Sequence, residues 1–101
     1  MKTMRKLYDQ CMEELCGVIE YSECSMMQVQ HDTELSKMYL NMAKQEMDHA
    51  KGLHAASQRL SSSKIGVEDV DPRLMELWEE MEMEKLKKMA EAKAWLDNAQ
   101  Q

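Results

Sequence analysis

Three residues of this 101-residue chain could together bind a cation: Glu14, Glu46 and His49. Glu46 and His49 form a Glu-x-x-His pair. Because residues three apart on a helix are neighbours on its surface, this spacing presents a carboxylate and an imidazole from one face. Carboxylate and imidazole groups are ligands for first-row transition metals. If Glu14 approaches the same point from another helix, the three side chains form a metal-binding group.

Helical periodicity places these residues on faces that are otherwise mostly apolar. Alternating spacings of four and three are typical of the inward stripe of a helix. In the second long segment they select Leu35, Tyr39, Met42, Glu46, His49, Leu53, Ala56 and Leu60. In the first segment they select Leu7, Cys11, Glu14, Val18, Tyr21 and Ser25. We therefore expect Glu14, Glu46 and His49 on buried stripes.

Three long segments carry these stripes: residues 3–30, about 33–60 and 72–99. Residues 30–33 form a tight connector in which Asp32 or Thr33 can cap the next helix. Residues 61–66 break the second segment, and Asp71-Pro72 is typical of a helix start, with Asp as the cap and Pro at the first helical position. No segment shows the alternation of a strand. The sequence predicts one all-α domain over residues 1–101, an antiparallel helical hairpin followed by a third long helix.

A hairpin centred between residues 31 and 32 sets the register of the first two helices. Residues whose numbers sum to about 63 then lie at the same height, so Glu46 faces about Gly17 and His49 faces about Glu14. Buried charges are costly unless they are paired or bind a metal. No Lys or Arg occupies the two stripes near this level. A bound cation is the simplest way to stabilise the group.

Length and charge exclude other classes of function. A chain this short buries a limited core, which favours an oligomer. With 13 basic and 19 acidic residues its net charge is -6, which argues against nucleic-acid binding. No apolar run is long enough for a membrane span or a secretory signal, so we expect a cytoplasmic protein. The three cysteines lack paired C-x-x-C spacing and are expected to be reduced and mostly buried.

Two copies of the hairpin would complete a larger site. A di-iron carboxylate bundle uses four Glu and two His, contributed by four helices. One chain offers Glu14, Glu46 and His49, which is half of that set. We therefore expect a homodimer, or a higher even-numbered oligomer, with the site at a twofold interface.

Residues 43–53, which include Glu46 and His49, are similar to the Glu-x-x-His-Ala helix of rubrerythrins and other ferritin-like proteins. In those families a ligand Glu on the preceding helix is followed seven residues later by Tyr, and here Glu14 is followed by Tyr21. Residues 12–21 look most like the encapsulated ferritins, half-length ferritin-like chains with di-iron sites between subunits. The resemblance covers about residues 7–60.

The resemblance implies a ferritin-like four-helix bundle formed by two chains. It implies that Glu14, Glu46 and His49 are the iron ligands and catalytic residues, and that Tyr21 orients a ligand carboxylate through a hydrogen bond. The implied activity is a ferroxidase type, oxidation of Fe(II) to Fe(III) by oxygen or peroxide, in iron handling or detoxification. The cofactor would be a di-iron centre, for which manganese or zinc could substitute.

Other interpretations of the motif residues stay open. The chain could be a non-catalytic helical oligomerisation or interaction module with a structural or vestigial metal site. Glu46 and His49 could instead be a buried hydrogen-bonded pair, and Glu13 could replace Glu14 after a modest rotation of the helix. The three cysteines and the methionines could in principle bind copper, although this would not explain Glu and His on inward stripes.

The remaining expectations concern residues outside the main motif. His31, in the connector, and His54, which points away from His49, are expected to be solvated rather than ligands. The third segment has a predicted inward stripe of Met75, Trp78, Glu82, Leu86, Met89, Lys93 and Leu96, which makes Glu82 another candidate buried carboxylate. Residues 97–101 are polar and lack an apolar extension, so we do not expect an encapsulin shell as a partner.

Overall fold

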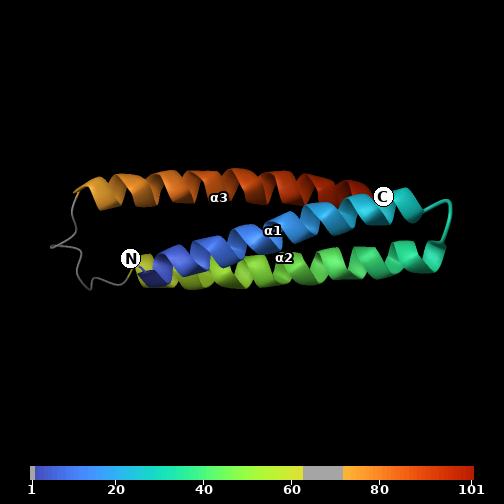
Figure 1. The fold of residues 1–101 in the computed structure, drawn as a ribbon, viewed down its shortest axis with the longest axis horizontal. Coiled ribbons are helices and arrows are strands. Elements are labelled where there is room, and N and C mark those ends of the chain that lie inside the picture. The colour runs from blue at the N-terminus through green and yellow to red at the C-terminus, as the bar shows by residue number, and fades with distance from the viewer. Residues whose placement is uncertain (1, 63–71) are drawn as a thin grey trace.

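The computed structural model describes residues 2–62 and 72–101, and this part of the chain is all helical. Its helices are α1 (Lys2–Gln28), α2 (Thr33–Ser62) and α3 (Pro72–Ala99). They form an elongated body of 56 × 18 × 17 Å in which α1 lies between α2 and α3 (Figure 1). Helix α2 runs antiparallel to α1, and α3 runs in the same direction as α1. The all-α class and the helical hairpin are confirmed.

The turn between α1 and α2 is tight and is closed by backbone and side-chain hydrogen bonds. The amide groups of His31 and Asp32 donate to the carbonyl oxygen of Gln28, at 3.0 and 2.8 Å. Asp32 then caps α2, because its Oδ1 accepts a hydrogen bond from the amide of Leu35 at 3.0 Å. Of the two caps predicted for this turn, the structure uses Asp32.

The C-terminal end of α2 and the N-terminal end of α3 lie on either side of residues 63–71, which the structure does not describe. Helix α2 continues to Ser62, two residues past the predicted end. The hydroxyls of Ser61 and Ser62 donate to the carbonyl oxygen of Gln58, at 2.9 and 2.8 Å. Helix α3 begins at Pro72 as predicted. Its predicted cap, Asp71, and residues 63–66 of the predicted break lie outside the described residues.

Mostly small buried residues spaced seven apart form a line along each helix of the hairpin. On α1 this line comprises Cys11, Val18 and Ser25, and on α2 it comprises Ser36, Ala43, Ala50 and Ser57, all of them buried. The hydroxyls of Ser25 and Ser36 each donate to the other residue's carbonyl oxygen at 2.8 Å. Small side chains therefore bring the two backbones close, and the spacing of seven is typical of helices packed side by side.

The stripe predicted on α2 differs from the buried line by one position. Seven of its eight members are only half-buried, and His49 is exposed. The prediction that Glu46 and His49 are fully buried is therefore wrong for the single chain. The prediction followed large apolar residues, whereas the buried line of α2 consists of serine and alanine. The predicted stripe forms the flank of α2 instead.

Helix α3 matches the predicted inward face only in part. Leu96 is buried and Trp78, Glu82 and Met89 are half-buried, as members of the predicted stripe. Met75, Leu86 and Lys93 are exposed, and Lys85 and Ala92, outside the stripe, are buried. The sequence pattern missed this phase because Lys85 is buried as an ion pair. Its Nζ lies 2.8 Å from Oε2 of Glu82, which is half-buried.

Two further predictions need correction. His54 is not solvated: its side chain is only 15% exposed, and its Nδ1 lies 3.7 Å from Oε1 of Glu82 on α3. Of the cysteines only Cys11 is buried, while Cys24 is intermediate and Cys16 is exposed.

No described helix has a stretch long and apolar enough to cross a membrane.

Candidate metal centre

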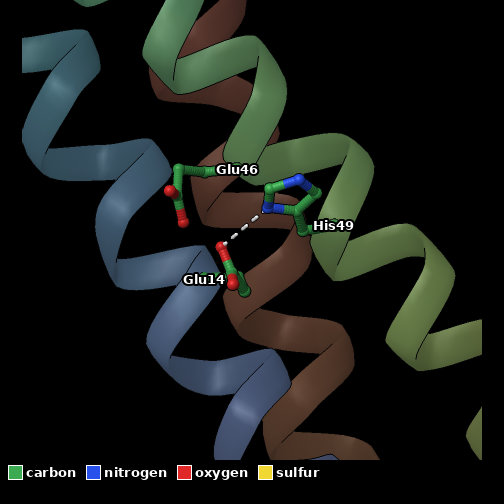
Figure 2. Close-up of side chains that lie close together, drawn as sticks. All are labelled: Glu14, Glu46 and His49. Carbon is green, nitrogen blue, oxygen red and sulfur yellow. Dashed lines mark ion pairs between the residues drawn. The ribbon is translucent and has the colours of Figure 1, made fainter.

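Glu14 from α1 and Glu46 and His49 from α2 point toward one another across the hairpin (Figure 2). Each offers one ligand atom, and these atoms all lie within 4.8 Å of one another. Nδ1 of His49 is 3.5 Å from Oε2 of Glu14. Ligand atoms around a tetrahedral ion at about 2.1 Å lie roughly 3.4 Å apart. Small side-chain rotations would therefore bring the three groups onto one cation.

The predicted register of the hairpin accounts for this convergence. His49 lies beside Glu14, as expected for residues whose numbers sum to 63. The side chain of Glu46 lies over Gly17: a Cβ atom built on Gly17 would be 3.1 Å from Oε2 of Glu46. Both predicted juxtapositions are confirmed.

The two carboxylates are close enough for Glu14 to affect the protonation of Glu46. A hydrogen bond with Glu14, then burial, then the charge of Glu14 raise the pKa of Glu46 from 4.5 to about 7, while the nearby His49 acts to lower it. In the metal-free chain Glu46 therefore keeps its proton to a higher pH than an ordinary glutamate does. A divalent cation would replace that proton, because metal ligands must be deprotonated.

Glu14 has a carboxylate oxygen that is free to bind a cation. Its Oε2 atom is buried and accepts no hydrogen bond from the described residues, although Nδ1 of His49 lies 3.5 Å away. The rest of the site is open: the side chain of His49 is 60% exposed and that of Glu14 is 27% exposed. An open cleft beside the group is lined by Glu14, His49, Gln10, Glu13 and Leu53. A cation can thus reach the ligand atoms from solvent.

Other candidate residues lie around the group rather than in it. Glu13 is exposed at the edge of the cleft, so the chain does not use it in place of Glu14. Tyr21 lies two helical turns along α1 from Glu14, and its ring stacks on that of Tyr39, with centroids 6.2 Å apart. His31 is exposed in the connector.

Sequence reasoning missed the roles of two residues near the site. Gly17 was identified only as the position opposite Glu46, although a Cβ atom there would come within 3.1 Å of the Glu46 carboxylate. A glycine in the interior of a helical pattern is a signal that could have indicated this. His54 was misplaced because its partner, Glu82, comes from a helix whose register the sequence does not reveal.

Comparisons with known proteins return no relative of this chain. No protein-family model matches it, and no significant match was found among curated proteins or solved structures. The residues themselves are therefore the basis for any functional proposal.

Proposed function

We propose that this chain binds iron through Glu14, Glu46 and His49, and that two copies form a di-iron site that oxidises Fe(II) to Fe(III). The observation that carries the proposal is the convergence of two carboxylates and an imidazole from two helices within 4.8 Å. Among the described residues no Lys or Arg forms an ion pair with either carboxylate, and the buried Oε2 of Glu14 accepts no hydrogen bond, although Nδ1 of His49 lies 3.5 Å away. Such a group favours a cation.

Each residue has a distinct part in this proposal. Glu14 and Glu46 bind through carboxylate oxygens, which suit iron and manganese, and His49 binds through a neutral imidazole nitrogen. Glu46, whose pKa is raised to about 7, must also release its proton before it can bind. Affinity therefore rises with pH as that proton is lost. When bound, iron supplies the electrons that reduce oxygen or peroxide.

A second copy of the chain completes the coordination. Three ligands from one chain leave an iron ion with open positions, and two copies provide the four Glu and two His of a di-iron carboxylate site. The flank of α2 that carries Glu46 and His49 also carries half-buried apolar residues: Leu35, Met42, Leu53, Ala56 and Leu60. A partner packed on this flank would cover them together with the exposed His49. The proposed assembly is thus a homodimer or a higher even-numbered oligomer.

Anaerobic addition of Fe(II), followed by air, tests the proposal. We expect an even-numbered oligomer by native mass, up to two irons per pair of chains, and growth of ferric absorbance faster than in buffer. Glu14→Gln, Glu46→Gln and His49→Ala should each weaken iron binding and slow oxidation.

Glu20→Gln is the matched control, because Glu20 is an exposed carboxylate on the same helix as Glu14. It should bind and oxidise iron as the wild type does. Iron binding without oxidation above buffer would instead support the alternative, a helical interaction module with a structural metal site. A strictly monomeric protein that binds no metal would refute the di-iron proposal.

A further inference from the structure

Gly17 lies in the middle of α1, where glycine is unfavourable. Helix α1 continues on both sides of it, from Lys2 to Gln28. Glycine has a low helix propensity because it loses the most backbone freedom on folding and has no side chain to pack. No turn or helix end lies at this position to account for the glycine.

The space beside Gly17 is occupied by Glu46. A Cβ atom on Gly17 would lie 3.1 Å from Oε2, 3.3 Å from Cδ and 3.3 Å from Cγ of Glu46. These distances are shorter than ordinary van der Waals contacts, so alanine would displace the Glu46 side chain by a few tenths of an ångström. All three nearest atoms belong to a single side chain, and that side chain is one of the three proposed ligands.

We propose that Gly17 is a positioning residue of the metal site: its missing side chain leaves a niche against α1 that holds the Glu46 carboxylate beside Glu14. This inference rests on the proposed function. The niche sets the separation of the two carboxylates, and therefore how well both can bind one ion. Ligand orientation of this kind typically changes metal affinity by about tenfold or more.

The chain contains a natural comparison for this residue. Gly52 lies inside α2, and a Cβ atom built on it would meet nothing within 4 Å. Gly52→Ala therefore measures the stability that a helix gains when alanine replaces glycine and the new methyl group contacts no neighbour. That gain should raise the thermal midpoint by roughly 4 °C.

A double-mutant cycle in metal-free protein tests the contact itself. We expect Gly17→Ala to raise the midpoint less than Gly52→Ala does. The Glu46→Ala protein lacks the side chain that an alanine at position 17 would displace. In this background Gly17→Ala should raise the thermal midpoint as much as Gly52→Ala does. Equal effects of Gly17→Ala in both backgrounds would overturn the proposed contact.

Cobalt(II) titration tests the consequence for the site. We expect Gly17→Ala to bind Co(II) about tenfold more weakly than the wild type and with altered d–d absorption bands, while native mass shows the same oligomer. Unchanged affinity and bands would overturn the inference. If the wild type bound no metal at all, the proposed function would fail instead, and the double-mutant cycle would still report on the contact between residues 17 and 46.

Discussion

At Glu46, metal binding and the stability of the metal-free chain favour opposite charge states. A metal site needs its carboxylate deprotonated beside Glu14, yet without a metal the two negative charges repel each other. The pKa of Glu46, raised to about 7, expresses this conflict. Because the folded chain holds this proton more tightly than the unfolded chain, the contribution to stability is complete below pH 4.5 and is lost as the pH rises toward 7. The metal-free site is therefore a source of instability at neutral pH.

Glu46→Gln should stabilise the metal-free protein at neutral and alkaline pH. Glutamine is uncharged at every pH and can donate a hydrogen bond to Glu14. At pH 8 we expect a gain of about 1–2 kcal/mol, reduced from the full pKa shift by solvent screening, or a rise in midpoint of roughly 5 °C. Near pH 4.5 the two proteins should melt together. Thermal unfolding with a chelator, from pH 4.5 to 8, measures the difference.

The same substitution should weaken iron binding, so that stability and metal affinity change in opposite directions. A stability loss at pH 8 in the Glu46→Gln protein would show that Glu46 is favourably paired in the metal-free chain. It would contradict the charge repulsion inferred here.

The three candidate ligands could be predicted from the sequence because their positions follow from local rules. Helix periodicity and a short connector fix which residues share a face and a height, and so Glu14 and His49 meet as expected. The sequence could not show how deeply these side chains are buried. The exposure of His49 depends on packing against residues that a pattern of large apolar side chains does not identify.

At the scale of the helices, α3 is held by a charged contact as well as by apolar packing. The Lys85 side chain is only 2% exposed, and its Nζ lies 2.8 Å from Glu82 and 3.5 Å from Oγ of Ser57 on α2. Nearer the surface, the hydroxyl of Tyr8 on α1 donates to Glu84 at 2.8 Å. Lysine is seldom buried unless it is paired; the pair with Glu82 lies within α3, and the hydrogen bond to Ser57 joins Lys85 to α2.

Lys85→Ala should destabilise the protein strongly, by about 3 kcal/mol, because it leaves a cavity and deprives Glu82 of its partner. Lys85→Met restores much of the volume without the charge and should lose less. Urea unfolding measures both changes.

Lys93 provides the matched control. Its Nζ is also 2.8 Å from a carboxylate, that of Asp97, but its side chain is 72% exposed. Exposed pairs contribute little, so Lys93→Met should change stability by about 0.5 kcal/mol or less. If Lys85 and Lys93 gave equal effects, the register of α3 would have to come from its apolar contacts alone.

The existence and extent of α3 were predictable, but its inward face was predicted only in part. Pro72 marks the helix start, whereas a buried lysine contradicts the rule that charged residues face water. The inward phase of α3 follows from a partner, Glu82, on the same helix and a hydroxyl on α2. Such pairings become visible only when all three helices are in place.

At the scale of the whole molecule, the α2 flank is the surface on which we propose that a second chain packs. Helix α1 lies between α2 and α3, while the flank of α2 that carries the candidate ligands keeps a series of half-buried apolar residues. A second copy on this flank would bury apolar surface and add three further ligands at the same time. Dimer formation and metal binding should therefore be thermodynamically linked.

Met42→Glu tests this linkage without altering a proposed ligand. Met42 is half-buried on the α2 flank, one turn before Glu46. In a dimer the new carboxylate would lie in the interface without a partner, so we expect a shift toward monomer by native mass. Iron affinity should fall by roughly tenfold although Glu14, Glu46 and His49 are all present. Helical circular dichroism should stay near that of the wild type, because the residue is not in the buried line.

Met83→Glu is the control for the added charge. Met83 is 66% exposed on α3, away from the α2 flank, and its replacement should change neither the oligomer nor the iron affinity. Because a dimer dissociates on dilution, the wild type should also lose iron affinity as its concentration falls, whereas the Met42→Glu protein should not. Concentration-independent affinity in the wild type would mean that each chain binds its metal alone, which would separate the metal site from the proposed interface.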